Sequence, residues 1–304
     1  MFMAIPFPAL TPEIFSIDLG PIHFALRWYA LGYLVGIAIG WWIIAQALKR
    51  TALWRDKPPM TRTQLEDLST WIIIGIIAGG RLGFVLFYQP GYYLSNPVEI
   101  LKVWQGGMSF HGGFLGVITA VFLFSRKHAL PLASVADCLA IAAPIGIGLV
   151  RIANFINAEL WGRPTDLPWG VIFPGEAAQT CLGIVGPCAR HPSQLYEAAL
   201  EGAVLAAVLL HLAFRSGWLK RPGALTGLFF LGYGFARFTV EFFRLADAQF
   251  ITPDNPWGHV IRVGHYGTTM GQTLTLPMII IGALTLIWAF RSTPKGASAG
   301  DQTP

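Results

Sequence analysis

Apolar runs of about twenty residues recur along this chain, and they restrict its fold more than any single motif does. An α-helix rises 1.5 Å per residue, so about 20 apolar residues cross the ~30 Å hydrocarbon core of a bilayer. Such runs cover 24–48, 66–88, 111–126, 133–156, 193–214, 224–244 and 271–290. Only 12% of the residues are charged, whereas a soluble domain has roughly 25%. The sequence therefore predicts an all-α polytopic membrane protein with seven transmembrane helices.

The loops between these runs carry Lys and Arg unevenly, which predicts the orientation of the chain. One set of loops holds twelve of them, namely Lys49, Arg50, Arg55, Lys57, Arg62, Arg126, Lys127, Arg215, Lys220, Arg221, Arg291 and Lys295. The opposite set holds four, namely Lys102, Arg163, Arg190 and Arg262. Loops rich in Lys and Arg stay on the cytoplasmic side, so we expect the N-terminus outside and the C-terminus inside. This topology accounts for most of the net charge of +5, and no nucleic-acid partner is needed to explain it.

The chain is expected to form one domain, because no polar linker between the runs is long enough to separate two. We expect a single transmembrane catalytic domain over 24–290, preceded by an outward segment, 1–23, and followed by a disordered cytoplasmic tail, 291–304. Cys181 and Cys188 lie in an outward loop, where oxidising conditions permit a disulfide. The sequence leaves open whether they form one.

Ionisable side chains inside the runs are candidates for function, because a charge at bilayer depth costs at least ~2.5–3.5 kcal/mol on insertion scales. The sixth run ends with GYGFARFTVEFFRLAD, in which Tyr233, Arg237, Glu241 and Arg244 share one helix face. Arg237 and Glu241 can pair at i,i+4. Two guanidiniums against one carboxylate favour an anionic ligand such as phosphate. The alternative is an ion-pair ladder that holds two helices together.

The stretch GLVRIANFINAELWGRP, at 148–164, gathers polar residues at the end of the fourth run. Capping of the last carbonyls and contact with lipid headgroups would explain Asn157 and Arg163. These roles explain Arg151 poorly, because it lies a full turn or more inside the helix. For Arg151 and for Asn154, three residues further on, the sequence favours a functional role.

A histidine stands at the start of the third run, in WQGGMSFHGGFLG. His111 is flanked by glycines, where backbone can approach a ligand closely. Imidazole titrates near neutrality and can take a proton from a thiol or hydroxyl, although a single histidine is more often structural. No second His or Cys stands at metal-ligand spacing and no H-E-x-x-H motif occurs, so the sequence does not predict a metal site.

Other polar residues in the runs have two interpretations each. In ARHPSQLYEAALEG, Gln194, Glu197 and Glu201 share a helix face, and the two glutamates would need partners such as the arginines. Tyr29 fits either a hydrogen-bond donor or an interfacial aromatic belt. Arg81 lies beside glycines in the second run, and it fits either helix packing or charge balance.

The stretch at 148–164 closely resembles the signature of bacterial prolipoprotein diacylglyceryl transferases. The blocks RWYALGYL, GGMSFHGG, HPSQLYEA and GYGFARFTVEFFR resemble the other blocks of that family, in the same order, from the first run to the sixth. The resemblance implies a multi-pass enzyme of the bacterial inner membrane whose N-terminus and active site face the periplasm. It would transfer the sn-1,2-diacylglyceryl group from phosphatidylglycerol to the lipobox cysteine of a prolipoprotein signal peptide. A thioether would form and glycerol phosphate would leave, and no cofactor or metal is implied.

The resemblance also marks a set of site residues, namely Tyr29, His111, Arg151, Asn154, Gly162, Tyr233, Arg237 and Glu241. The reaction needs a thiolate from a thiol with an unperturbed pKa near 8.5, and it needs donors that stabilise the departing phosphate. We expect Arg151 and Arg237 to bind the phosphate and Arg244 to add a third cation.

Further roles follow for the remaining residues. We expect Asn154 and Tyr233 to orient the phosphate and Glu241 to hold the Arg237 side chain. His111 is the expected proton acceptor for the incoming thiol, unless the field of the arginines lowers the thiol pKa without a dedicated base. Tyr29 and Gly162 are expected at the lipid site. Substrates would have to enter the site laterally from the bilayer. Five glycines, which have no side chain, could leave openings for this entry, namely Gly79, Gly80, Gly112, Gly113 and Gly162.

Two other functional classes are alternatives to the transferase hypothesis. A transporter or channel for an organic anion would use the same buried arginines, but it should place polar residues on both sides of the midplane. A structural membrane protein would use them only as ion-pair links between helices, so that loss of an arginine lowers stability and any activity together.

Overall fold

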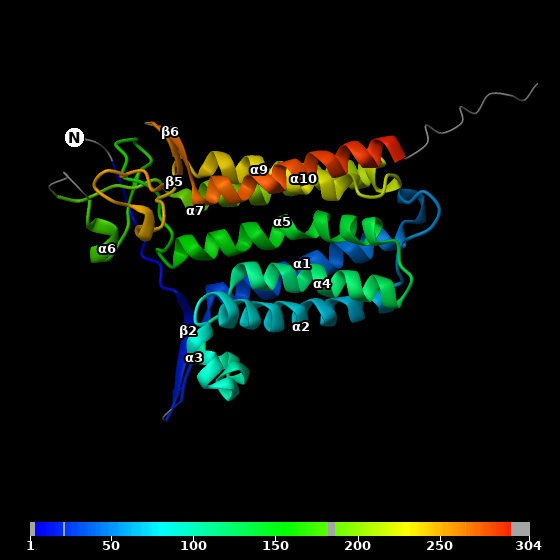
Figure 1. Cartoon of the computed structure of the whole chain (residues 1–304), viewed down its shortest axis with the longest axis horizontal. Helices are drawn as coiled ribbons and strands as arrows, with labels where there is room; N and C mark the ends of the chain where they lie inside the picture. The colour runs from blue at the N-terminus through cyan, green and yellow to red at the C-terminus, as the bar shows by residue number, and fades with distance from the viewer. Residues whose placement is uncertain (1–3, 21, 182–185, 265, 293–304) are drawn as a thin grey trace, which may run out of the picture.

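The computed structural model describes residues 4–20, 22–181, 186–264 and 266–292, and most of them are helical. The axes of the long helices are roughly aligned with one another, as Figure 1 shows. Long helical segments occupy all the predicted apolar runs: α1 (Trp28–Lys49), α2 (Arg62–Phe87), α4 (Phe110–Lys127), α5 (Leu132–Ile156), α7 (Ser193–Glu197) continued by η4 (Ala198–Val204) and α8 (Leu205–Arg215), α9 (Ala224–Val240) and α10 (Met270–Ser292).

Within the described residues, five of these segments are long and apolar enough to cross a bilayer, namely Trp28–Lys49, Arg62–Phe87, Leu132–Ile156, Ser193–Arg215 and Met270–Ser292. Helix α9 is apolar but has 17 residues, and α4 has 18 and ends with Arg126 and Lys127. Large apolar side chains such as Ile74 and Leu284 are exposed on the outer faces of the bundle. An apolar surface of this extent suits lipid as the surrounding solvent. The protein is therefore a mostly helical membrane protein.

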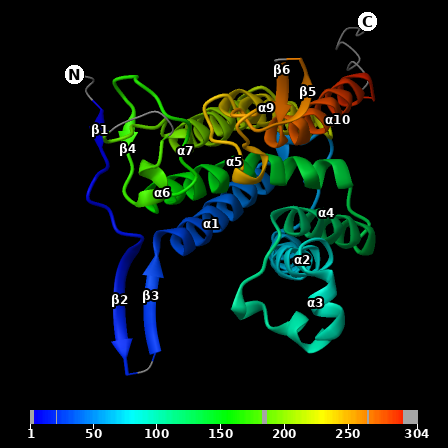
Figure 2. The ribbon, with the colours of Figure 1, turned by 60° about the vertical axis from the view of Figure 1, so that its left-hand side comes forward.

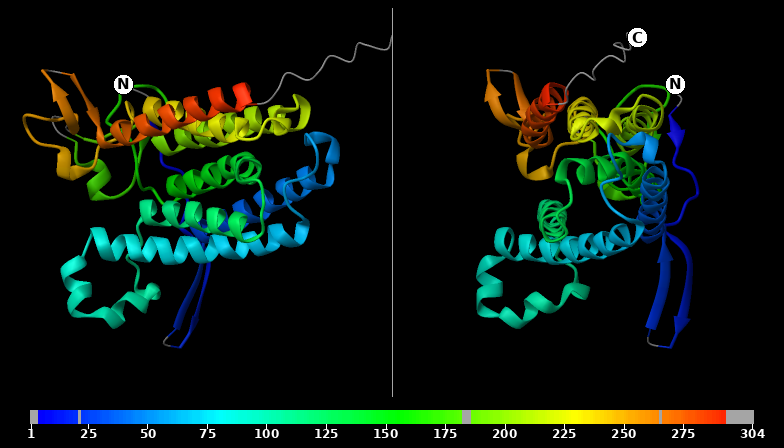
Figure 3. Two further views of the ribbon diagram at one scale, coloured as in Figure 1. Left: turned by 45° about the vertical axis from the view of Figure 1, so that its right-hand side comes forward. Right: turned by 90° about the vertical axis from the view of Figure 1, so that its right-hand side faces the viewer.

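Helix α5 lies at the centre of the bundle, where it contacts α1, α4, α7, α8 and α9. Helices α2 and α4 pack together on one flank, and α9 and α10 pack together on the opposite flank; both views of Figure 3 show this arrangement. The central position of α5 means that polar residues on its last turns face several helices at once.

The apolar core is concentrated at one end of the bundle. Its fully buried side chains come from the starts of α2, α5 and α9 and from the ends of α4 and α8, and include Leu65, Phe124, Val135, Leu209 and Leu225. All of these positions lie toward the end of the molecule that carries the short connections η1 (Thr51–Leu53) and η5 (Trp218–Lys220). Most of the buried charged side chains lie toward the opposite end.

One buried acid at the apolar end has a structural role. Asp137 of α5 is fully buried, and it accepts hydrogen bonds from Gly223 N (2.7 Å), Thr226 N (2.7 Å) and Thr226 Oγ1 (2.7 Å). These donors belong to the first turn of α9, whose N–H groups have no partner within the helix. The carboxylate thus caps α9 from a neighbouring helix.

Short strands and helices gather at the polar end of the bundle, as Figure 2 shows. The strands form three pairs: β1 (Ile5–Pro6) parallel with β4 (Val171–Ile172), β2 (Glu13–Leu19) antiparallel with β3 (Ile22–Arg27), and β5 (His259–Val263) antiparallel with β6 (Tyr266–Thr269). The short helices are α3 (Pro90–Ser95), η2 (Pro97–Leu101), η3 (Val103–Gln105), α6 (Glu176–Gln179) and η6 (Ala248–Phe250). The bundle is helical, as predicted, but the fold as a whole is mostly helical and not all-α, because segments between and beside the long helices pair as strands.

Two predicted run boundaries were wrong. The first run was expected to begin at 24, but Ile22–Arg27 is strand β3 and the helix begins at Trp28. The sixth was expected to continue to 244, but α9 ends at Val240. Apolar side chains occur in both a strand and a helix, so hydropathy alone does not separate the two. Of the predicted tail, 291–304, only Arg291 and Ser292 are described, and they end α10.

Candidate active site

Five ionisable side chains from three parts of the bundle converge at its polar end. Arg151 comes from the last turns of α5, Glu197 from α7, and Arg237 from the last turn of α9. Glu241 and Arg244 follow the end of α9 directly. We call these five residues the arginine–glutamate cluster.

Glu197 is the centre of this cluster. Its side chain is 0% exposed, and its Oε1 accepts hydrogen bonds from Arg237 Nη1 and from Arg244 Nη1 (3.0 Å). Its Oε2 lies 3.1 Å from Arg151 Nε. One carboxylate thus connects α5, α9 and the segment after α9, which fixes three guanidiniums relative to one another.

Glu241 holds Arg237 from a second side, as the i,i+4 spacing predicted. Its Oε2 lies 2.7 Å from Arg237 Nη2, and the residue is 4% exposed. Gly271 of α10 packs against this carboxylate, since a Cβ there would lie 2.5 Å from Glu241 Cδ. A glycine is needed at this position because any side chain would displace the carboxylate.

The helix stripe expected on α9 is only partly present. Helix α9 ends at Val240, and Arg244 forms an isolated bridge with Gly162. Backbone hydrogen bonds between residues four apart continue past the helix, from Glu241 N to Arg237 O (3.1 Å) and from Arg244 N to Val240 O (3.1 Å), so Arg244 reaches Glu197 from a turn that follows α9. Residues 233–244 contribute two guanidiniums and one carboxyl group, as expected, but they are not the only charged groups of the site. Glu197 and Glu201 from the neighbouring helix add two carboxyl groups, so three guanidiniums face three carboxyls.

The guanidiniums of the cluster retain free donors despite these pairs. A guanidinium carries five N–H groups. Among the described residues, Arg151 Nη2 and Arg237 Nε donate no hydrogen bond. The three arginine side chains are each 14–20% exposed, whereas Glu197 is sealed from solvent. The carboxylates therefore lie behind the guanidiniums, which leaves the guanidiniums accessible to an anion.

Asn154 links the cluster to the loop after α5. It is 1% exposed, its Oδ1 accepts from Arg151 Nη1 (3.3 Å), and its Nδ2 donates to Glu159 Oε1 (2.7 Å). Asn157 Nδ2 donates to the same carboxylate oxygen (3.4 Å). Sequence reasoning did not assign a role to Glu159, although it lies inside the quoted 148–164 stretch. Glu159 is therefore connected to Arg151 through Asn154.

Two tyrosine positions adjoin the cluster. Tyr233 of α9 is partly buried and interacts electrostatically with Arg151, Arg237 and Glu201. Tyr29 of α1 does not contact an arginine of the cluster directly: it hydrogen-bonds with Tyr33, and the two rings meet edge to face at 5.2 Å. Tyr33 in turn interacts with Arg151. Sequence reasoning missed Tyr33, which lies one helical turn after Tyr29.

Gly162 has a packing role that its sequence position did not indicate. Gly162 N donates to His191 O (2.9 Å), and Arg163 N donates to Phe243 O (2.8 Å). A Cβ on Gly162 would lie 2.4 Å from Phe243 O and 2.7 Å from His191 O. The glycine therefore allows the 157–163 loop to lie against the segment that carries Arg244.

His111 is separated from the cluster in the structure. It lies in the first turn of α4, is exposed, and contacts the Phe110 ring. It makes no hydrogen bond or ion pair with any residue in the described part of the chain. The structure thus brings together Arg151, Asn154, Tyr233, Arg237, Glu241 and Arg244, and leaves His111 on the α2–α4 flank.

Most of the glycines considered as room for substrate entrances are instead filled by close packing. A Cβ on Gly79 would lie 2.4 Å from Gly112 O, and a Cβ on Gly112 would lie 2.3 Å from Gly79 O. Gly80 similarly meets Met108. Small residues let the backbones of α2 and α4 approach each other, as is common between membrane helices. Gly113 alone of this set has no atom closer than 3.7 Å.

A mostly apolar groove of about 390 Å³ lies between α7 and the end of α9, at the same end of the bundle as the cluster. Its walls include Trp169, His191, Tyr196, Leu200, Val240 and Phe243. Tyr196 and Val240 immediately precede the cluster residues Glu197 and Glu241. Tyr196 Oη accepts from Trp169 Nε1 (2.8 Å) and lies 3.1 Å from His191 Nδ1. Burial lowers the pKa of His191, which favours its neutral form in this wall.

Two other buried arginines serve the loops at the polar end. Arg81 of α2 donates to Glu99 O (2.6 Å), Ile100 O (2.9 Å) and Gly106 O (2.7 Å), and its guanidinium lies 5.0 Å from the Tyr93 ring centre. Arg81 therefore anchors the 99–107 loop, a role that neither helix packing nor charge balance describes.

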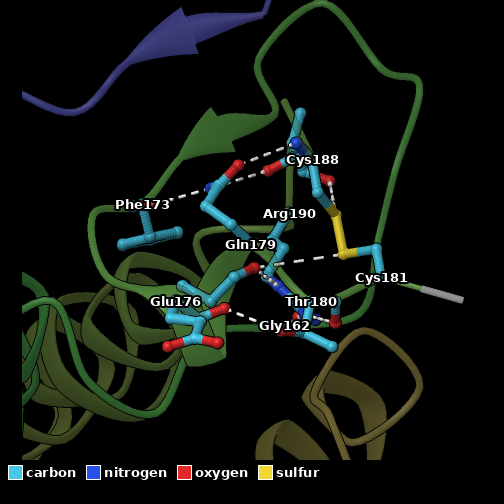
Figure 4. The surroundings of a disulfide bond; sticks show 10 residues. Gly162, Phe173, Glu176, Gln179, Thr180, Cys181, Cys188 and Arg190 are labelled. Carbon is cyan, nitrogen blue, oxygen red and sulfur yellow. Dashed lines mark hydrogen bonds between the residues drawn. A yellow bond between two sulfur atoms is a disulfide. The ribbon is translucent and has the colours of Figure 1, made fainter. Parts of the chain in front are cut away.

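Arg190 has the same kind of role beside a disulfide. Cys181 and Cys188 are joined in the structure (Figure 4), which answers the question that the sequence left open. Gln179 holds this loop through Phe173 O and Cys188 N, and Arg190 donates to Thr180 O (3.1 Å) and Gly162 O (3.3 Å). The disulfide loop therefore supports the chain segment that contains Gly162.

Comparison with known proteins gives one consistent result. The family model described as prolipoprotein diacylglyceryl transferase matches residues 12–288. A phosphatidylglycerol–prolipoprotein diacylglyceryl transferase from Cereibacter sphaeroides is 61% identical over 95% of this chain and 99% of its own length. Proteins of the same name from Ruegeria pomeroyi and Nitrobacter winogradskyi are 60% and 46% identical, over 97% and 100% of this chain and 100% and 96% of their own lengths.

Proposed function

The chain belongs to the prolipoprotein diacylglyceryl transferase family, and from this premise we propose that the arginine–glutamate cluster binds the phosphate of its lipid substrate. Its reaction transfers the sn-1,2-diacylglyceryl group from phosphatidylglycerol to the cysteine thiol of a prolipoprotein, which is the first step of lipoprotein maturation. The observation that carries the proposal is the convergence of three guanidiniums with free donors beside an apolar groove. A phospholipid offers a matching pair of features, an anionic phosphate next to acyl chains.

The chemistry of the transfer explains why such donors are needed. The lipobox sulfur attacks the glyceryl methylene carbon, a C–S bond forms, and the C–O bond to the phosphate breaks. Glycerol phosphate leaves with the electron pair of that bond, and the thiol proton passes to a base. The departing phosphate gains negative charge, and preorganised donors that meet this charge lower the barrier more than they stabilise the bound lipid.

Each residue of the cluster has a distinct proposed role. Arg151 and Arg237 bind the phosphate through the N–H groups that the glutamates leave free, and Arg244 adds a third cation. Glu197 and Glu241 are positioning residues, because they fix the guanidiniums without facing solvent themselves. The geometry is set before the substrate arrives, so no reorganisation is needed at the moment of reaction.

Four further residues are proposed to support the lipid site. Asn154 and Tyr233 orient the phosphate beside Arg151 and Arg237. Tyr29 acts through Tyr33, with which it hydrogen-bonds. Gly162 acts by allowing the loop after α5 to approach the segment of Arg244, and not by contact with lipid alone.

His111 remains the proposed proton acceptor for the thiol. Its exposed position at the start of α4 suits a group that meets a second substrate arriving from the bilayer. The lipobox cysteine would then approach the glyceryl carbon from the α4 side while the phosphate is held at α5, α7 and α9. In a displacement at carbon the attacking sulfur and the departing phosphate lie on opposite sides of the carbon, which this arrangement provides.

The proposed topology has seven spans, with α4 and α9 added to the five long apolar helices. The N-terminus and the active site face the periplasm, the C-terminus faces the cytoplasm, and residues 24–290 form one catalytic domain in the inner membrane. The charge distribution of the loops supports this orientation. The connections η1 and η5 belong to the loops rich in Lys and Arg, so the proposal places them on the cytoplasmic side.

An anion transporter is less well supported than the transferase. A transporter would need polar groups for its substrate at both ends of the bundle, and the buried acid at the apolar end, Asp137, is fully used in capping α9. The test is purified protein in vesicles containing phosphatidylglycerol and a lipobox peptide. Lipidated peptide and released glycerol phosphate are expected. Anion flux without lipidated peptide would overturn the proposal.

A further inference from the structure

Glu201 differs from the glutamates of the cluster in having almost no partner. It lies in the π-helical segment η4 and is 0% exposed. Neither of its carboxyl oxygens forms a hydrogen bond with a described residue. Among the described residues, the guanidinium nitrogen closest to its carboxyl group is Arg151 Nε, 3.9 Å from Oε2. Glu197, four residues earlier, takes the close contacts of all three guanidiniums.

The packing of η4 explains why Glu201 stays in this position. Gly202 lies against Gly148 of α5, where a Cβ would be 2.6 Å from Gly148 Cα. Gly148 precedes Arg151 by three residues, so the contact fixes Glu201 about one turn from Arg151. Charged and titratable groups face it from every neighbouring element: Arg151 from α5, Tyr233 and Arg237 from α9, Arg244 from the segment after α9, and Glu197 from its own helix.

A buried carboxylate without hydrogen bonds is expensive. Removal of an ion from water costs several kcal/mol unless close partners and hydrogen bonds replace the lost hydration. Glu197 and Glu241 each have a guanidinium nitrogen within 3.1 Å, whereas the closest one to Glu201 is 3.9 Å away. A neutral carboxyl group avoids most of this cost, because a protonated acid is far less strongly hydrated than an anion.

We infer that Glu201 holds a proton in the resting enzyme and so sets the charge of the neighbouring cluster. With Glu201 neutral, the three guanidiniums and the two carboxylates of the cluster sum to +1. That charge matches the single negative charge of a phosphodiester headgroup. Glu201 is thus a positioning residue for substrate charge, and this inference rests on the proposed binding of phosphate at the cluster.

The enzymatic test compares Glu201→Gln with the matched variant Glu197→Gln across pH. Wild-type protein should need a larger mole fraction of phosphatidylglycerol for half-maximal rate at alkaline pH, as Glu201 loses its proton. Glu201→Gln cannot ionise, so this alkaline rise should disappear, and its loss of rate near neutral pH should stay below about ten-fold. Glu197→Gln removes a charged partner of three guanidiniums and should lose at least about 100-fold. Equal losses in the two variants, or an alkaline rise that persists in Glu201→Gln, would overturn the inference.

A spectroscopic measurement tests the same inference without turnover. Infrared difference spectra of wild-type protein in bilayers, recorded as pH is raised, should show the carbonyl stretch of a buried protonated carboxylic acid. This band should be missing in Glu201→Gln and present in Glu197→Gln. If wild-type protein shows no such band, or if Glu201→Gln retains it, Glu201 is ionised and the inference fails. Because this readout needs no lipidated product, it separates failure of the inference from failure of the proposed function.

Discussion

Arg81 and the arginines of the cluster are all held inside the bundle near its polar end, yet their partners differ in kind. Arg81 donates to the backbone carbonyls of the 99–107 loop and stacks on Tyr93. Arg151 and Arg237 instead meet the carboxylates of Glu197 and Glu241. Arg190, in the disulfide loop, follows the pattern of Arg81.

This difference separates a structural arginine from a binding one. A carbonyl is neutral and fixed in the chain, so a guanidinium that satisfies several of them stabilises a loop and has little left to offer a ligand. A carboxylate neutralises a guanidinium but leaves other N–H groups free, and it pre-orients them for a second anion. The partner, and not burial alone, therefore indicates which arginine is a candidate for substrate binding.

The largest effect is expected from Arg237→Ala. Removal of one preorganised donor to a developing anion costs about 2.7–4 kcal/mol of barrier, a loss of roughly 10²–10³ in rate. The measurement is lipidated peptide formed per mole of folded protein in detergent or vesicles. The thermal unfolding temperature should also fall, because the buried carboxylates of Glu197 and Glu241 lose a partner, but the protein should still fold. If the folded fraction keeps the activity of wild type, the cluster is only an ion-pair link and the contrast with Arg81 disappears.

His111→Asn tests whether chemistry also resides on the α2–α4 flank. General-base catalysis contributes typically about 10²–10⁴ in rate, and we expect a loss of about 100-fold in the transfer step. Phosphatidylglycerol binding should be little changed, since His111 does not contact the cluster. A rate within a few-fold of wild type would remove His111 as the base and leave thiolate formation to the field of the arginines.

Arg81→Ala is expected to lower stability and spare chemistry. Loss of a charged donor to several partly buried carbonyls costs about 1–3 kcal/mol, because these oxygens lose their partner inside the protein. Thermal unfolding and proteolysis of the 99–107 loop report the effect. The turnover of the protein that remains folded should stay near wild type. A selective loss of turnover with unchanged stability would place Arg81 in the binding machinery.

The smallest effect is expected from replacing both Cys181 and Cys188 by Ser. A disulfide that closes so short a loop stabilises a protein by about 2 kcal/mol in the chain-entropy model, and Gln179 and Arg190 still hold the loop. The free energy of unfolding should fall by that amount or less, with turnover retained. A large loss of turnover would mean that the disulfide loop controls the position of Gly162 and the cluster.

The sequence predicted the helices well because a bilayer requires long apolar segments. It also predicted the Arg237–Glu241 pair, since that contact depends only on helical spacing. It did not predict β3 at Ile22–Arg27, where apolar residues form a strand beside the first helix. Nor did it predict the end of α9 at Val240.

The rest of the site depends on packing between distant segments. Glu197 pairs with Arg151, Arg237 and Arg244 only because α7 packs against α5 and α9. The sequence indicated that Glu197 needed a cationic partner but not which one. Helical spacing places Tyr33 beside Tyr29, but it does not indicate that Tyr33 interacts with Arg151. The hydrogen bond from Asn154 to Glu159 depends on the folded loop after α5. The close contact of Gly162 with Phe243 O likewise requires the folded loop.

The most direct test of the account is an experimental structure of the protein with phosphatidylglycerol bound. We predict that the headgroup phosphate lies within hydrogen-bond distance of Arg151 or Arg237, with Glu197 still behind them and the acyl chains along the groove of Tyr196 and Phe243. A headgroup found elsewhere, with the guanidiniums of the cluster contacting only their glutamates, would contradict it.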